Sequence, residues 1–592
     1  MRIGQCLMSA AVVAGLTACS GSQAAPSTSE REPQVTAEAP QPCLVNDDAG
    51  TVSIWHSMGS NVALDLWEEF KAEFEGTHES TLNLRQFGGD LSLVEALAAA
   101  SPNDLPDVVI ATEQATRTLL DSSLFMQPDE CDPALASDVL PLARATYTVQ
   151  GNLVALPFGV SVPVLIYDMA EFREAGLDPF APPLTLDALL DASAAIQQSG
   201  ASPYGWVLPD SCGNLVLEQY SARRGSLVST PRNGREGGLT VVDFATAESI
   251  ADLTEIRDGV VAGHVKYIGA NSSNFDDLEA IVAPGDGAAM TVHTSAALGD
   301  ILELLESGNW PGVELGVGPL PGPGVGSLLG GNALWMLDSG DSERVGRTLS
   351  ALKWLYEPQQ LARLAAATGY VPATGAAATE QVLLDRWAQY PQLKVAYDQV
   401  VSTTVSDATA GLVMGPSNDR AFVLYDACTK IMADGEDVKA TLQDASRLMN
   451  DLLVQYDALQ SGAPLPNQPQ VSGPSSSAGT ALPPGDVEVS GFVECASGAP
   501  VVGIWVESAS AGSGWAERSE PGASRVEYRY TLPVAGRYQL HVGCGGGESD
   551  WGSTNFSPFV EGSTNSFVCS DTSGAQDGIC TIASPDWSRL VD

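Results

Sequence analysis

Polar and aromatic side chains follow three strand-like segments near the start of the chain. The segments are residues 51–55, 81–86 and 107–111, each short and rich in apolar or alternating residues. Ligands in open α/β sheets bind beyond the carboxyl ends of strands. The side chains at these ends are therefore candidates for binding a small ligand by hydrogen bonds and stacking: His56, Ser57, Gln86, Phe87, Glu113 and Gln114.

The sequence motifs that carry covalent or metal chemistry are missing. There is no GxSxG elbow, no P-loop and no GxGxxG after a strand. The five histidines never stand at HxH or HExxH spacing, and no cysteines form a CxxC pair. We therefore predict no catalytic residue, no metal site and no cofactor, and we favour a binding protein over an enzyme.

Strands and helices alternate around these candidates. The segment 61–75 places five apolar residues on one helical face, and 91–100 is a second helix. The alternation recurs after residue 160, and helices dominate from about residue 342 to 460. This order predicts α/β architecture with parallel strands.

The first residues read as an export signal. Arg2 precedes an apolar run, Leu7 to Leu16, which is far shorter than the ~20 residues that span a bilayer. Leu16-Thr17-Ala18-Cys19 resembles a bacterial lipobox, which implies cleavage after residue 18 and a lipid attached to Cys19. Residues 19–43 then form a flexible tether rich in Ser, Gly, Ala, Pro and Thr. We predict a lipid-anchored protein on the extracytoplasmic face of the cell membrane; the alternative is an ordinary cleaved signal with an incidental cysteine.

The net charge is −45, from 28 basic and 73 acidic residues. A surface this acidic repels phosphate backbones, which excludes nucleic acid as a partner. The charge is spread along the chain, as expected for a solvated surface suited to high salt.

Eight cysteines remain for disulfides once Cys6 leaves with the signal and Cys19 carries lipid. An exported protein meets oxidising conditions, so structural bridges are expected. Eight cysteines allow 105 pairings, and nine remain if four belong to each of two domains. Among these nine we predict the pairs 43–131, 212–428, 495–544 and 569–580.

The composition changes at Ser461. Residues 461–486 are rich in Pro, Ser, Gly and Gln and read as a linker. Residues 487–592 contain short β-like runs, including 501–506, 525–532 and 538–542, and predict a small disulfide-stapled β-sandwich. Four tryptophans in this unit suggest either core packing in a spacer or a platform for glycan or cell wall, and we favour the spacer.

The segment 153–196 carries a family resemblance. It contains Ala155-Leu156-Pro157-Phe158-Gly159, Val164-Leu165-Ile166-Tyr167-Asp168, Phe172 to Pro179, and Thr185 to Leu190. This resembles the signature region of bacterial extracellular solute-binding proteins of the family-1 type, the group that includes maltose-binding protein. The sequence departs from the pattern at Gly159, where a small polar or β-branched residue is usual, and at Leu186, where Trp is common.

Further family-like segments follow in order at 287–292, 330–335, 368–372 and 434–453. The resemblance covers about residues 50–460 and implies an α/β, two-lobe periplasmic-binding-protein (Venus-flytrap) fold over 44–460, before the C-terminal β-sandwich. It also implies a small-molecule ligand, most often a mono- or oligosaccharide, that the lobes enclose and present to ABC permease subunits.

The resemblance adds candidates from later segments: Phe158, Ser161, Trp206, Asn214, His293, Trp335 and Tyr370. A sugar needs flat apolar platforms for its C–H faces and forked polar groups for its hydroxyls. Trp206, Trp335, Phe87 and Tyr370 would supply the platforms. Glu113, Gln86, Asn214 and His293 would supply the polar groups. A second class of function stays open: a surface adhesion or sensory lipoprotein that uses the same fold without delivering cargo.

Overall fold

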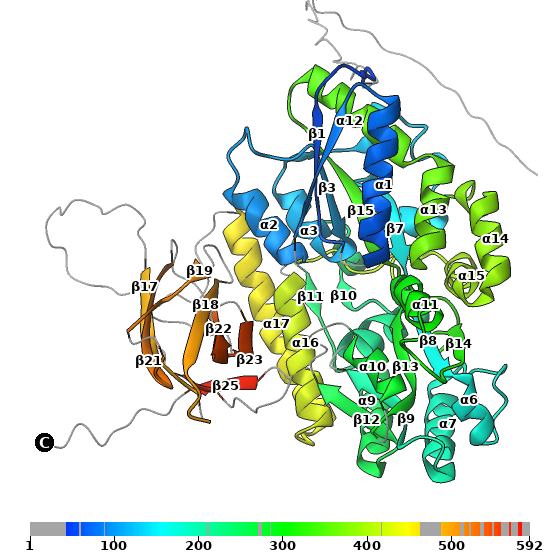
Figure 1. Cartoon of the computed structure of the whole chain (residues 1–592), viewed down its shortest axis with the longest axis vertical. Coiled ribbons are helices and arrows are strands. Elements are labelled where there is room, and N and C mark those ends of the chain that lie inside the picture. The colour runs from blue at the N-terminus through cyan, green and yellow to red at the C-terminus, as the bar shows by residue number, and fades with distance from the viewer. Residues whose placement is uncertain are drawn as a thin grey trace, which may run out of the picture. The chain divides into compact units, whose positions relative to one another are not determined.

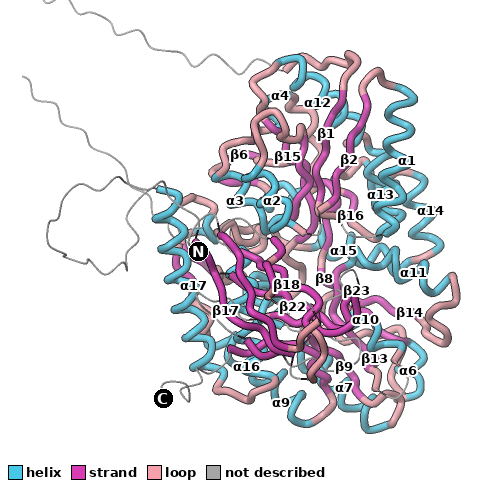
Figure 2. Tube along the Cα trace, turned by 60° about the vertical axis from the view of Figure 1, so that its left-hand side comes forward, coloured by secondary structure: helices cyan, strands magenta, loops and turns pink. Residues whose placement is uncertain are grey.

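The computed structural model describes residues 43–582 apart from 59–60, 88, 210–211, 239, 270–274, 284–285, 416, 462–486, 496, 509–513, 520–521, 533–537, 548–549, 558–566 and 570–577. The predicted signal, Cys19, the tether up to residue 42 and nearly all of the predicted linker lie outside the described residues. Figures 1 and 2 show the arrangement of the elements. Among the described residues, no helix is both long and apolar enough to cross a membrane.

The first lobe, called the N-lobe, is built on a mixed sheet with the strand order β16-β7-β15-β3-β1-β2, and β4 pairs with β15. Its central strands β1 and β3 are parallel, whereas β15 runs antiparallel between β3 and β7. The strands are β1 (Thr51–His56), β2 (Thr81–Gln86), β3 (Val108–Thr112), β4 (Phe125–Met126), β7 (Leu156–Ser161), β15 (Gly330–Leu337) and β16 (Val371–Pro372).

Amphipathic helices share the core of this sheet. In α1 (Asn61–Thr77) the predicted apolar face is buried, with Trp67, Phe70 and Phe74 at most 2% exposed. Burial of such a stripe, rather than intrinsic propensity, supplies most of a helix's stability. The other N-lobe helices are α2 (Asp90–Ala99), α3 (Thr116–Asp121), α4 (Pro128–Cys131), α5 (Pro141–Thr146), α11 (Leu298–Glu306), α12 (Ser342–Leu355), α13 (Pro358–Thr368), α14 (Gln381–Gln389) and α15 (Lys394–Ser402).

The second lobe, called the C-lobe, has a five-stranded sheet of order β12-β9-β13-β8-β14 and its own apolar core. The strands are β8 (Pro163–Asp168), β9 (Tyr204–Pro209), β12 (Val265–Gly269), β13 (Ala288–Thr294) and β14 (Leu315–Pro319). Around them lie α6 (Met169–Glu174), α7 (Leu186–Ser199), a π-helical turn (Asn214–Tyr220), α8 (Ser221–Arg223), α9 (Ala247–Ala262), α10 (Asp276–Val282), α16 (Ser417–Met432) and α17 (Val438–Ser461).

The predicted helix after Thr185 shows why these helices begin and end where they do. The Thr185 Oγ1 accepts a hydrogen bond from the backbone N–H of Ala188, which caps the start of α7. Gly200, at φ 78°, ends the helix in the left-handed region that glycine adopts at no steric cost. Leu186, which departs from the family pattern, is buried in the C-lobe core.

The chain crosses between the lobes at five places. In the shortest, β7 of the N-lobe passes into β8 of the C-lobe through the single residue Val162. The others run from β13 to α11, from α11 to β14, from β14 to β15 and from α15 to α16. Val162 is buried, and its backbone is hydrogen-bonded to Ser295 on both sides: Ser295 N donates to its carbonyl at 2.9 Å, and its N–H donates to Ser295 Oγ at 3.3 Å.

Beyond the linker, the described strands form a nine-stranded sheet of order β19-β18-β22-β23-β25-β24-β17-β21-β20 around one apolar core. The sheet folds over so that β18 contacts both β17 and β21, which gives the predicted sandwich. The strands are β17 (Val487–Cys495), β18 (Val501–Ser508), β19 (Gly514–Trp515), β20 (Glu517–Arg518), β21 (Arg525–Leu532), β22 (Tyr538–Gly547), β23 (Asp550–Phe556), β24 (Phe567–Cys569) and β25 (Gly578–Ile582).

The four predicted disulfides are confirmed. Cys43 pairs with Cys131 in the N-lobe, and Cys212 pairs with Cys428 in the C-lobe. The pairs Cys495–Cys544 and Cys569–Cys580 close the β-sandwich. The Cys212–Cys428 bridge joins the start of the π-helical turn to α16.

Candidate functional site

Glu113 marks the centre of a polar site at the edge of the N-lobe sheet. It follows β3 directly, as predicted, and it lies beside the first residue of the antiparallel neighbour β15. A Cβ placed on Gly330 would lie 3.7 and 3.8 Å from the two Glu113 carboxylate oxygens and 3.6 Å from Ser161 Oγ. Glycine at this position therefore leaves room for a third group beside the carboxylate and the hydroxyl.

A second carboxylate ties the ends of β1 and β3 together. Asp90, at the start of α2, accepts a 2.5 Å hydrogen bond from Ser57 Oγ. It also accepts from Thr112, through the backbone N–H at 3.1 Å and through the side-chain hydroxyl. Asp90 thus holds the predicted residue Ser57 in place next to Glu113.

The surroundings of Glu113 shift its protonation. Burial, helped by the nearby Asp90 charge, raises the pKa of the carboxyl to about 7, against the opposing effects of its own backbone N–H, the Arg420 charge and the Gly331 backbone N–H. Glu113 is thus close to half-ionised at neutral pH. A carboxyl in this state can accept hydrogen bonds from a ligand or donate one, depending on pH.

Tyr370 forms one wall of the site. Its ring lies flat against β7, since a Cβ on Gly159 would approach ring atoms of Tyr370 to 3.2 Å. The absent side chain at Gly159, one of the two departures from the family pattern, is what allows this packing. Asn332 Nδ2 donates to the Tyr370 hydroxyl at 3.0 Å, and the buried Asn332 Oδ1 has no partner among the described residues.

The C-lobe contributes an ion pair to the same region. Arg420 on α16 is bound to Glu218 on the π-helical turn, and their side chains are 6% and 14% exposed. Arg420 lies close enough to Glu113 to affect its pKa across the two lobes. Asn214, a predicted residue on the same turn, is half-buried, and its Oδ1 has no partner among the described residues.

For three aromatic residues, the structure does not agree with the predicted contact to a ligand. Trp206, Trp335 and Phe158 are at most 1% exposed and belong to the two lobe cores, so they offer no platform to a ligand. Each lies on an interior strand of its sheet, β9, β15 or β7, where helices and loops cover both faces. Tyr370, by contrast, is half-buried and lies close enough to Glu113 to interact with it electrostatically.

The remaining predicted residues lie around or away from this centre. His56 is 3% exposed and stacks on Trp67, and burial lowers its pKa. Gln86 donates to the Met58 carbonyl at 3.1 Å, Phe87 packs on Trp55, and Gln114 is exposed. His293 is held by the buried Asp277 at 3.1 Å, so its role as a ligand fork is not supported by its contacts.

A buried arginine clasps the two lobes together. Arg235 of the C-lobe is 5% exposed and donates to the N-lobe carbonyls of Ala145, Thr146 and Thr148 at 2.8–3.1 Å. It also donates to the carbonyls of Ala410 and Gly411 in the segment between α15 and α16. Burial lowers the pKa of its guanidinium to about 10, so it stays charged at neutral pH.

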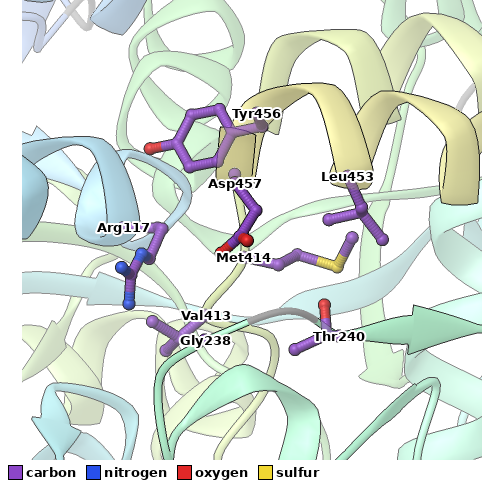
Figure 3. Close-up of a pocket in the computed structure, with 9 residues that line it drawn as sticks. Arg117, Gly238, Thr240, Val413, Met414, Leu453, Tyr456 and Asp457 are labelled. Carbon is purple, nitrogen blue, oxygen red and sulfur yellow. The ribbon is translucent and has the colours of Figure 1, made fainter. Parts of the chain in front are cut away.

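A second bridge between the lobes lies at α3 and α17. The Tyr456 hydroxyl donates to Asp121 Oδ2 at 2.6 Å, and Arg117 pairs with the same carboxylate. Figure 3 shows Arg117, Tyr456 and Asp457 around a cavity of about 30 Å³ that residues 413–415 also line. The cavity has room for about one water molecule and is too small for a sugar.

Five site residues were not predicted from the sequence: Asp90, Tyr147, Glu218, Asn332 and Arg420. Tyr147 is fully buried and donates to the Gly331 carbonyl at 2.8 Å, which fixes the start of β15. Two sequence features could have identified Asp90 and Asn332. Asp90 is a carboxylate that follows a pair of glycines, and Asn332 is an asparagine within the Gly-Gly strand. Arg420 gave none, because its helix reads as an ordinary amphipathic segment.

The site has groups that can bind hydroxyl groups. It gathers a carboxyl, a hydroxyl, a phenol and two amide oxygens from both lobes, and its cation Arg420 is engaged by Glu218. Within the described residues, no group of three or more His, Cys, Asp or Glu side chains could hold a metal ion. Convergent polar groups of this kind orient a small ligand.

Comparison with known proteins places this chain in a family. Residues 66–395 match the model for bacterial extracellular solute-binding proteins. The sn-glycerol-3-phosphate-binding periplasmic protein UgpB of Salmonella typhimurium is 24% identical over 428 residues, which cover 69% of this chain and 93% of UgpB.

Solved structures agree on the fold. The GacH receptor of Streptomyces glaucescens, solved unliganded and with acarbose, superposes with a TM-score of 0.57 at 18% identity, covering 68% of this chain and 98% of that receptor. UgpB of Mycobacterium tuberculosis with glycerophosphocholine gives 0.55 at 20% identity, covering 68% and 98%. The chain is a ligand receptor and belongs to the bacterial extracellular solute-binding protein family.

Proposed function

We propose that this receptor binds a neutral, polyhydroxylated small molecule, a mono- or oligosaccharide or a polyol, and presents it to the permease of an ABC importer. The observation that carries the proposal is the Glu113 carboxyl, which lies together with Ser161 Oγ beside Gly330, a position without a side chain. Sugar hydroxyls donate readily to a carboxylate, while the half-buried Tyr370 ring offers a flat face for C–H groups. A lipid on Cys19 would hold the receptor at the extracytoplasmic face of the membrane.

The charges of the site argue for a neutral ligand over a phosphate ester, although relatives carry names that include glycerol-3-phosphate. A phosphate group needs cations or several backbone N–H donors. At this site the Arg420 charge is engaged by Glu218, and Glu113 and Asp90 add negative charge. A phosphate ester would meet these carboxylates without a free counter-charge.

A thermal-shift panel with the full chain tests the ligand class. Neutral sugars and polyols are compared with glycerol-3-phosphate and glycerophosphocholine, because a ligand that binds only the folded state stabilises it by about 2.7 kcal/mol at a hundredfold excess over Kd. We expect a rise in Tm with at least one neutral compound and none with the phosphate esters. A rise with the phosphate esters alone contradicts the proposal, and silence across the panel favours the adhesion or sensory role.

The pH dependence of ligand affinity tests the role of Glu113. If ligand hydroxyls donate to the ionised carboxylate, only the deprotonated receptor is competent. With the pKa of the free site at about 7, ligand affinity should rise about tenfold between pH 6 and pH 8. In Glu113→Gln the affinity should be weaker at pH 8 and nearly independent of pH, as measured by isothermal titration calorimetry.

Glu171 provides the matched control, because burial also raises its pKa to about 7 but it lies on α6, away from the site. Glu171→Gln should keep the wild-type pH profile of ligand affinity. The stability of the ligand-free protein depends on pH in the opposite direction to ligand affinity. The pKa of Glu113 is higher in the folded than in the unfolded chain, so the free energy of unfolding falls as pH rises from about 4.5 to 7. A pH profile that survives in Glu113→Gln would show that another group controls binding.

A further inference from the structure

The outer surface of the β-sandwich carries an ordered row of aromatic side chains. In the strand register, Trp505 of β18 lies opposite Trp515 of β19 on one side and opposite His541 of β22 on the other. The alternate residues of the same strands, Ile504, Val506, Leu540 and Val542, are fully buried in the sandwich core. The row therefore points away from the core, since side chains alternate along a strand.

A polar row runs next to the aromatic one. Glu507 lies opposite Gln539 in the register, two residues along from Trp505 and His541. His541 Nε2 and Glu507 Oε2 are 2.6 Å apart, which fixes the carboxylate at the border between the rows. We call these five residues, Trp505, Trp515, His541, Glu507 and Gln539, the Trp505 face.

The two indoles are arranged as a corner. Their ring centroids are 5.4 Å apart and their planes meet at 85°, while Trp515 stays 59% exposed. Among the described aromatic residues with large exposure, only Phe180 accompanies Trp515. The exposed indole of Trp515 lies on a strand beside a fixed carboxylate. It therefore presents a stacking surface with hydrogen-bonding groups at its edge.

We propose that the Trp505 face is a second binding site, for a neutral polysaccharide. Pyranose rings stack their C–H faces on indoles, and their hydroxyls reach the Glu507 carboxylate and the Gln539 amide in the adjacent row. The charge of the unit selects the polymer, because residues 487–592 contain 13 acidic and 5 basic residues. This balance repels anionic polymers and disfavours a second copy of the same face. The receptor would thereby hold to a glycan surface independently of the ligand site in its lobes.

Retention of the full chain on insoluble cellulose, chitin and granular starch tests this site. We expect the wild type to bind at least one of the three, and Trp515→Ala to bind it at least tenfold more weakly in depletion isotherms. Because Trp515 is largely exposed, its loss should leave the urea midpoint of unfolding close to that of the wild type. Phe180→Ala removes another exposed aromatic, 80% exposed on the C-lobe, and should bind like the wild type.

Other outcomes overturn the proposal. Absence of retention on all three polysaccharides, or equal retention of Trp515→Ala and the wild type, removes the stacking role. A dimer in analytical ultracentrifugation that Trp515→Ala converts to a monomer would show that a second copy of the chain covers this face. Binding of small sugars to the lobe site is measured separately, by the Tm shifts of the wild type and of Glu113→Gln. Failure of the lobe site and failure of the Trp505 face are therefore distinguishable.

Discussion

Replacing Cys212 and Cys428 with alanine should lower the free energy of unfolding of the C-lobe by about 5 kcal/mol. The bridge closes a loop with a sequence separation of 216, the largest of the four disulfides, so its removal returns the most conformational freedom to the unfolded chain. Both cysteines are buried in the C-lobe core. Urea denaturation of the variant and the wild type measures the loss.

The same variant should bind ligand more weakly. The bridge fixes the π-helical turn, which carries Glu218, against α16, which carries Arg420. The Cys43–Cys131 pair is the control: its separation of 88 predicts a similar loss of stability, of about 4–5 kcal/mol, but it joins elements of the N-lobe away from this ion pair. Removal of the control pair should spare ligand affinity at temperatures where the protein is folded. Equal losses of affinity in the two variants would contradict the argument.

Arg235→Met should separate the lobes and destabilise the protein by about 3 kcal/mol or more. The variant keeps an apolar stem but leaves five carbonyl oxygens without their donor, and each buried acceptor without a partner costs about 1–3 kcal/mol. Opening lets water reach these carbonyls, so part of the cost is relieved by movement of the lobes. Small-angle scattering should show a larger radius of gyration in Arg235→Met without ligand.

Arg232, three residues earlier, is the matched control. It forms an exposed ion pair with Asp407 and Glu236, of the kind that contributes little to stability in water. Arg232→Met should therefore leave both the scattering dimensions and the urea midpoint close to the wild type. If the two arginine variants behave alike, the clasp has no special role in joining the lobes.

Much of the fold could be predicted from local pattern. The apolar segment 51–55 is β1 (Thr51–His56), and the helical segment 61–75 is α1 (Asn61–Thr77). Both could be predicted because the spacing of apolar residues along the sequence indicates which side chains are buried. Assigning four cysteines to each domain reduced the possible disulfide pairings to nine, and the four pairs predicted among them are the ones observed. In each case residues close in the chain, or a small set of alternatives, decide the result.

The site was less predictable, for physical reasons that Trp206 and Arg420 illustrate. Trp206 follows a turn and could face a ligand, but its strand is paired on both sides and its indole fills the C-lobe core. Arg420 comes from a helix far along the chain from Glu113, and only the packing of both lobes brings the two charges together. Glu113 and Ser57 could be placed at strand ends because the end of a strand is a local feature, whereas burial and partners depend on the whole fold.

The single-residue crossing at Val162 also determines the order in which a ligand contacts the two lobes. A rotation of one lobe about this residue displaces atoms in proportion to their distance from it, so Ser161 and the adjoining Glu113 barely move relative to Val162. A ligand that first meets these N-lobe groups finds them already in position, and contacts to C-lobe groups farther from Val162 form in a later, slower step. Stopped-flow traces would then show a bimolecular phase whose rate grows with ligand concentration, followed by a phase whose rate reaches a plateau.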